Sequence, residues 1–175
     1  IRIALAAAVI ILSVGYFSAQ RLLETNSSTE GHAVEQTNSQ YTASSSLTGD
    51  GEYRQTALFA NGCFWCVEHD FEKVRGVIDV VSGYAGGSSD NPTYGNYADD
   101  GHREVVLVTY DPTIVTFGNL VEHTIKYGDP TDIGGSFGDR GEQYAPAIYY
   151  ETDAEKAEAN RVIRAVDSLG VFAGP

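Results

Sequence analysis

Residues 55–74 read QTALFANGCFWCVEHDFEKV, and their pattern is that of a strand, a tight turn and a helix. Gln55–Ala60 predicts a short strand, and Cys63–Val74 predicts a helix, with Asn61 and Gly62 between them. The apolar residues of the predicted helix recur at helical spacing, at Phe64, Val67, Phe71 and Val74. A strand that turns sharply into a helix places Cys63 at the helix N-terminus.

Further elements alternate on the C-terminal side of this stretch. Strands are predicted at Val77–Tyr84, Glu104–Tyr110 and Tyr144–Tyr150, and helices at Thr116–Tyr127 and Thr152–Leu169. Thr152 followed by Glu155 is typical of a helix start. The order β-α-β-β-α-β with a C-terminal helix predicts an α+β fold. The predicted architecture is a two-layer sandwich of the split βαβ (ferredoxin-like) type, with a mixed or antiparallel sheet, helices on one face and long functional loops.

Two long glycine-rich loops, Gly86–Gly101 and Gly128–Gln143, separate these elements. Loops of this length inside a compact domain are usually functional. Their Tyr, Pro and Asp residues argue against plain disorder. We therefore expect both loops to contribute to a site.

The N-terminal third of the chain has a different composition. Ile3–Ala19 is an apolar run between Arg2 and Arg21, which predicts that residues 1–21 form a membrane anchor or a signal segment, and an uncleaved anchor is favoured. Residues 22–52 are polar and read as a flexible linker. Residues 53–175 form the predicted catalytic domain, exported or held outside the cytoplasm. The sequence has no Met, and both of its ends read as cut.

Charge and cysteine content narrow the functional classes. The formal net charge of −13 argues against nucleic acid as a partner, because phosphate binding requires clustered Lys and Arg. Two cysteines are too few for the disulfide framework of a small secreted protein. The two cysteines therefore indicate a chemical role rather than a structural disulfide.

Three interpretations of Cys63 and Cys66 are open on the residues alone. The first is a redox dithiol, because the unpaired N–H groups at a helix start favour a nucleophilic thiolate. The second is half of a zinc site extended by His69, although a structural site needs a fourth ligand. The third is two inert core thiols. The polar, glycine-bounded setting favours the dithiol, and we expect no bound metal.

A series of motifs in order then suggests a family. They are Gly62-Cys63-Phe64-Trp65, Ser82-Gly83-Tyr84-Ala85-Gly86-Gly87, Asn91-Pro92-Thr93-Tyr94, Gly101-His102-Arg103-Glu104-Val105-Val106, Asp129-Pro130-Thr131 and Asp139-Arg140-Gly141-Glu142-Gln143-Tyr144. From about residue 58 to residue 149 the chain resembles peptide methionine sulfoxide reductase A. Each motif alone is weak, but the ordered series is specific.

The resemblance implies roles for single residues. Cys63 matches the nucleophile that attacks the sulfur of a methionine S-sulfoxide, and Glu104 matches the acid that protonates its oxygen. Tyr94 and Tyr144 match two phenols that hydrogen-bond this oxygen. Three further matches concern the substrate's surroundings: Phe64 and Trp65 as the apolar wall around the S-methyl group, and Asp139 as a nearby carboxylate.

The resemblance also implies the rest of the cycle. Cys63 would become a sulfenic acid and form a disulfide with Cys66, the only other cysteine of the chain. Thioredoxin or a similar dithiol would then restore both thiols, without a cofactor. Substrates would be oxidised proteins or free methionine sulfoxide, and we expect a monomer.

The chain departs from the family pattern in three places. The loop between Tyr94 and Gly101 is shorter than usual, Gly128 replaces a histidine, and Ala145-Pro146 replaces Arg-Ser. The family domain also continues beyond Pro175. Two other classes stay open: a membrane-tethered thiol–disulfide oxidoreductase acting on protein disulfides, and a noncatalytic binding module.

Overall fold

Strand β4 (Tyr53–Ala60) lies in the middle of the main sheet. The computed structural model describes residues 10–13, 17–18, 46–47 and 53–172. The side chains of β4 alternate between exposed and half-buried over its first half, and all four residues from Ala57 to Ala60 are buried. The strand thus runs from the exposed edge of the sheet into the core, and Asn61 and Gly62 follow directly after the buried end of β4.

The predicted split βαβ arrangement is confirmed. Strand β4 continues through helix α1 (Phe64–Phe71) into β5 (Val77–Ala85), and β6 (Arg103–Tyr110) lies between β4 and β5. Strand β9 (Ala147–Tyr150) pairs with the other side of β4. These four strands have the order β9-β4-β6-β5 and every pairing among them is antiparallel.

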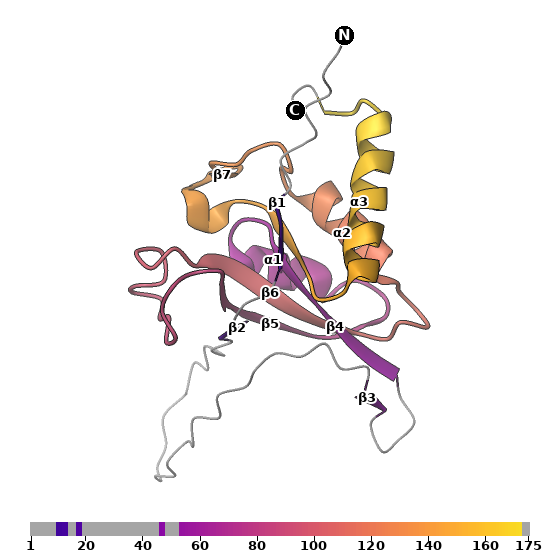
Figure 1. Ribbon diagram of the computed structural model, residues 1–175, viewed down its shortest axis with the longest axis horizontal. Coiled ribbons are helices and arrows are strands. Elements are labelled where there is room, and N and C mark those ends of the chain that lie inside the picture. The colour runs from indigo at the N-terminus through magenta and orange to yellow at the C-terminus, as the bar shows by residue number, and fades with distance from the viewer. Residues whose placement is uncertain (1–9, 14–16, 19–45, 48–52, 173–175) are drawn as a thin grey trace.

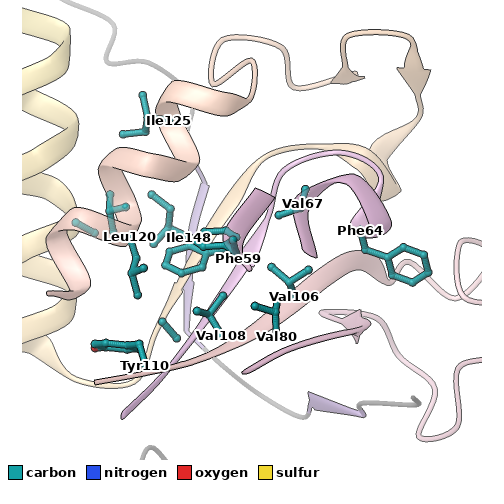
Figure 2. Close-up of a cluster of buried hydrophobic side chains, with 14 of the residues drawn as sticks. Phe59, Phe64, Val67, Val80, Val106, Val108, Tyr110, Leu120, Ile125 and Ile148 are labelled. Carbon is teal, nitrogen blue, oxygen red and sulfur yellow. The ribbon is translucent and has the colours of Figure 1, made fainter. Parts of the chain in front are cut away.

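The three α-helices of residues 53–172 lie on the same side of the sheet, as Figure 1 shows for α1, α2 (Phe117–Tyr127) and α3 (Asp153–Ser168). Thr116 and Thr152 begin α2 and α3 with reciprocal side-chain to backbone hydrogen bonds of the capping-box type. The main core lies between these helices and the sheet, and Figure 2 shows Phe59, Val106 and Val108 directed from their strands toward the helices. Truncation of the fully buried Phe59 to Ala should destabilise the fold by about 3–5 kcal/mol.

The second long loop is partly ordered by short elements, which the sequence analysis did not predict. Strands β7 (Gly135–Ser136) and β8 (Asp139–Arg140) form a small hairpin, and a 3-10 helix, η1 (Glu142–Tyr144), follows. The predicted strand from Tyr144 therefore begins only at Ala147. Pro146, which has no N–H to donate to a sheet, lies immediately before it.

The predicted helix over Cys63–Val74 is shorter at both ends. Cys63 is the N-cap of α1, and the helix ends at Phe71. The N–H of Val74 bonds to the carbonyl of Phe71 at 2.9 Å, a turn contact that leads into Gly76 at a φ of +100°. This glycine lets the chain reverse into β5.

Most of the predicted anchor and linker lies outside the described residues. Within residues 1–52, the structure describes β1 (Ile10–Ser13), which pairs with β9, β2 (Phe17–Ser18), which pairs with β5, and β3 (Ser46–Leu47), which pairs with β4. Among the described residues, no helix has both the length and the apolar character that a bilayer span requires.

Candidate active site

The turn between β4 and α1 places Cys63 at the start of the helix. Gly62 has a φ of +95°, and a Cβ there would lie 2.8 Å from the Cβ of Ser136. Cys63 itself is extended, with φ −58° and ψ 117°, while its carbonyl accepts the N–H groups of Cys66 and Val67 at 3.0 and 3.1 Å. The half-buried Cys63 side chain therefore lies at the N-terminal end of α1, where the helix dipole is positive.

Glu104 lies next to this turn, as its match to the family acid predicts. It is only 2% exposed, near the start of β6. Its Oε2 accepts the backbone N–H of Phe64 at 2.9 Å, and its Oε1 accepts the hydroxyl of Tyr97 at 2.6 Å. Since Phe64 follows Cys63 in the chain, these bonds hold a buried carboxyl group beside the cysteine.

Burial raises the pKa of Glu104 above its usual value. The hydrogen bonds from Tyr97 and Phe64 act in the opposite direction, and the charge of Asp139 adds to the rise. Burial prevails, so the carboxyl keeps its proton to a higher pH than an exposed glutamate does. A group in this state can donate a proton.

Tyr97 is a site residue that the sequence analysis missed. It is 6% exposed, and its ring stacks on that of Tyr84 with 4.6 Å between centroids. Burial and hydrogen bonds with Glu104 and Tyr144 raise its pKa, so the phenol stays a donor. Tyr144, at the end of η1, therefore lies at the same site through its contact with Tyr97. Neither apolar spacing nor a motif singled out Tyr97 in the sequence.

His102 fixes the loop that carries Tyr97. The buried imidazole accepts the N–H of Gly87 at 3.2 Å, and its other nitrogen lies 3.1 Å from the hydroxyl of Ser89. Its backbone N–H bonds to the carbonyl of Tyr97 at 3.0 Å. The two ends of the loop are thus tied together, which holds Tyr97 over Glu104.

A group of aromatic side chains lies on the same side of the site as Glu104 and Tyr97. Trp65 and Tyr94 are 51% and 54% exposed, and their rings stack with 5.7 Å between centroids. The buried ring of Phe64 contacts Trp65 at 5.2 Å. Of the four predicted aromatic residues, the structure therefore brings together Phe64, Trp65 and Tyr94 in this group. The phenol bonded to Glu104 is that of Tyr97.

Cys66 is exposed and lies one helical turn from Cys63. Both cysteines are free thiols, and their side chains are in hydrogen-bonding contact. Desolvation, the neighbouring Cys63 and the charges of Asp139 and Asp70 raise the pKa of Cys66. Asp139, exposed in β8, acts on both Cys66 and Glu104 and so lies near both.

A cavity of about 210 Å³ opens beside the two thiols. It lies between α1, α2 and the β7–β8 hairpin, and six of the residues that line it are Cys63, Cys66, Asp70, His123, Tyr127 and Phe137. Phe137 has a φ of 51°, the left-handed conformation, which costs a side-chain-bearing residue roughly 1–2 kcal/mol. The hairpin therefore holds this 70% exposed ring at the cavity under strain.

The zinc interpretation receives no geometric support from the described residues. In residues 53–172 no three His, Cys, Asp or Glu side chains are placed to share a metal ion, so His69 does not join the two thiols in such a group. A dithiol beside a buried acid and a phenol is the arrangement that the described residues form.

Comparisons with known proteins agree with this geometry. The chain is 50% identical over 123 residues to the peptide methionine sulfoxide reductase MsrA/MsrB of Vibrio cholerae, covering 69% of this chain and 32% of that protein. It is 52% identical over 118 residues to peptide methionine sulfoxide reductase MsrA 2 of Rhizobium meliloti, covering 66% and 59%. The chain thus spans less than two thirds of either relative.

A solved structure has the same fold. Methionine sulfoxide reductase A of Corynebacterium diphtheriae superposes with a TM-score of 0.61 at 32% identity, covering 70% of this chain and 63% of that one. The model of the family "Peptide methionine sulfoxide reductase" matches residues 55–175, a range that holds every residue of the site described above. The chain therefore belongs to the peptide methionine sulfoxide reductase family.

Proposed function

We propose that this chain reduces methionine S-sulfoxide, in peptides or free, to methionine, with Cys63 as the nucleophile. The observation that carries the proposal is the buried Glu104 carboxyl, held beside Cys63 by the Phe64 N–H and the Tyr97 hydroxyl. A dithiol alone could exchange disulfides. A proton donor of raised pKa beside the thiol provides what a sulfoxide oxygen requires.

The first step transfers oxygen from the substrate to the cysteine. The Cys63 thiolate attacks the sulfoxide sulfur, and Glu104 gives a proton to the oxygen as negative charge develops there. The oxygen then moves to the Cys63 sulfur: the new sulfur–sulfur bond and the sulfur–oxygen bond of the substrate break, a sulfur–oxygen bond forms at Cys63 to give a sulfenic acid, and the sulfide leaves. Two electrons pass from the cysteine sulfur to the substrate sulfur.

The residues around Cys63 orient the sulfoxide for this step. Tyr144 places a phenolic donor on the Glu104 side, where it can stabilise the developing oxyanion, and Tyr97 positions Glu104 through its own hydroxyl. Phe64, Trp65 and Tyr94 offer an apolar, polarizable surface to the S-methyl group. Asp139 acts at a distance, through its charge on Glu104 and Cys66.

The second step regenerates the site. Cys66 as thiolate attacks the Cys63 sulfenic acid, which forms a disulfide and releases water. Thioredoxin or a similar dithiol protein then reduces the disulfide by exchange and is itself oxidised. The exposed position of Cys66 makes one sulfur of this disulfide accessible to an external thiolate.

The same exposure favours a second candidate function, thiol–disulfide exchange with protein substrates. One experiment separates the two functions. It measures formation of N-acetylmethionine from the separated S and R epimers of N-acetylmethionine sulfoxide, and in parallel the reduction of insulin disulfides. We expect S-specific turnover that is lost in Cys63→Ser and falls about 10²-fold or more in Glu104→Gln. Insulin reduction without sulfoxide turnover would establish the second function instead.

We also propose that residues 1–21 attach the catalytic domain to a membrane, and that the domain lies outside the cytoplasm. The support is the apolar run Ile3–Ala19 followed by a polar linker. Pairing of Ile10–Ser13 with β9 and insertion of the same residues into a bilayer exclude each other. Membrane fractionation with and without residues 1–21 decides between them, since recovery of the complete chain in the soluble fraction would contradict an anchor.

A further inference from the structure

Two different surfaces meet at Cys63. On one side lie Glu104, Tyr97 and the Trp65–Tyr94 pair. On the other side lies the cavity of about 210 Å³, whose lining includes Cys63 but none of those four residues. A sulfoxide bound with its oxygen at Glu104 therefore leaves this cavity open for another part of the same substrate.

The cavity combines aromatic walls with negative charge. Phe71, Tyr127 and Phe137 contribute aromatic rings, and Asp70 and Asp139 contribute carboxylates. Among the described residues, neither Lys nor Arg lines it. Aromatic faces and carboxylates together attract an organic cation with an apolar stem.

His123 adds an imidazole ring to the wall. Its Nε2 atom is buried and has no hydrogen-bond partner in the described part of the chain. Burial lowers the pKa of this imidazole, so it is neutral at pH 7 and does not repel a cation. Its ring packs between Phe71 and Tyr127, with centroids at 4.9 and 4.4 Å.

Two lysines lie near the cavity without lining it. Lys73 pairs with Asp70 at 3.2 Å, and its side chain is exposed. The ammonium of Lys126 lies 5.4 Å from the ring centroid of Tyr127. An exposed pair of this kind is weak, so a substrate cation can compete for Asp70. Asp139 has no ion pair within residues 53–172, because the neighbouring Arg140 pairs with Asp132.

We propose that this cavity binds the side chain of a lysine or arginine adjacent to the oxidised methionine, which makes peptides with such a cation the preferred substrates. The inference rests on the proposed function for its substrate class. Adjacent residues are about 3.8 Å apart at Cα, and a long cationic side chain can therefore reach from the sulfoxide at Cys63 into the cavity. A free methionine sulfoxide lacks this contact.

Binding can be measured without turnover. Trp65 is the only tryptophan of the chain and stands at the site, so its fluorescence in the Cys63→Ser variant reports bound peptide. The probes are blocked tripeptides with S-sulfoxide at the centre and Lys, Ala or Glu on either side. We expect the better Lys peptide to bind about fivefold more tightly than the Ala peptide at low salt, and the difference to shrink at high salt.

Matched variants locate the effect. In the same Cys63→Ser background, Asp70→Asn and Phe137→Ser should each reduce the preference for Lys over Ala. Glu72→Gln removes the same charge as Asp70→Asn from the end of the same helix but does not line the cavity, and should preserve the preference. Equal dissociation constants for the Lys and Ala peptides would overturn the inference, as would a loss in Glu72→Gln as large as that in Asp70→Asn.

The proposed function is tested separately by turnover of the same peptides by the unchanged chain. Reduction of Lys and Ala peptides with equal binding means that the reductase assignment stands and the cavity assignment fails. Tighter binding of the Lys peptide without turnover of either peptide means that the cavity assignment stands and the reductase assignment fails.

Discussion

Tyr97 donates its phenolic hydrogen to Oε1 of Glu104 across 2.6 Å, inside the core and beside Cys63. The bond lowers the pKa of the carboxyl, while burial raises it further than the bond can offset. One phenol therefore both positions the acid and sets the pH range over which it holds its proton. The resemblance assigns Tyr94 to the sulfoxide oxygen, and in this structure the ring of Tyr94 stacks on that of Trp65.

Tyr97→Phe should lower kcat about 10- to 100-fold, because Glu104 loses the phenol that positions it for proton transfer. It should also shift the pH profile. Removal of a bond that lowers the pKa of Glu104 raises that pKa, so the loss of activity caused by Glu104 deprotonation moves to higher pH. Measurement of kcat from pH 5 to 10 checks both effects.

Tyr94→Phe is the matched control, for which we expect a smaller fall in kcat and no shift of the pH profile. An unshifted pH profile in Tyr97→Phe would show that the phenol does not tune the pKa of Glu104.

Glu104→Gln should change the pH dependence of stability. The pKa of Glu104 is raised in the folded chain and about 4.3 when unfolded, so the folded state binds the extra proton between these values. Stability contributed by this proton is complete below about pH 4.3 and is lost as pH rises through the folded pKa. Urea unfolding from pH 4 to 8 should therefore show the wild type losing stability relative to Glu104→Gln as pH rises. A constant difference would contradict the raised pKa.

The sequence predicted the elements whose signals are local and periodic. The strand–turn–helix around Cys63 and the split βαβ order follow from apolar spacing and Gly62, and Glu104 was identified by its motif. Tyr97 could not be identified in this way, because its burial depends on how His102 ties the loop ends together. The cavity was also beyond prediction, since Asp70, His123 and Phe137 meet only through the packing of α1, α2 and the hairpin.

Cys66→Ser should arrest the cycle after one turnover. Without an external reductant, both this variant and the wild type should release about one methionine per chain, but only the wild type should end as a disulfide. The variant should retain a Cys63 sulfenic acid, which dimedone labelling and mass mapping detect. A wild-type product that carries sulfenic acid at Cys63 and a free Cys66 thiol would refute the resolving role.

The rate of disulfide formation in the wild type adds a pH test of the same role. The pKa of Cys66 is raised, and the attacking species is its thiolate. The rate should therefore increase as pH rises through the pKa of Cys66. Quenched-flow alkylation of the remaining thiols measures this rate directly. A rate that does not depend on pH would contradict attack by Cys66.

Gly128→Ala should destabilise the fold, although Gly128 has an ordinary extended backbone, at φ −125°. A Cβ there would lie 1.9 Å from Oδ1 of Asn61, the buried residue that precedes Gly62 and donates to the carbonyl of Thr124 at 2.9 Å. Displacing this side chain breaks a buried hydrogen bond, which costs about 1–3 kcal/mol.

A double-mutant cycle measures this coupling by urea unfolding. With Asn61→Ala in place, nothing is left for the new Cβ to displace at that position, so the added Gly128→Ala should cost roughly 1–2 kcal/mol less than it does alone. Gly138→Ala is the control, because a Cβ at Gly138 meets no atom within 4 Å. Additive effects of the two substitutions would show that Asn61 does not explain why this chain carries glycine at position 128, and that the cost has another source.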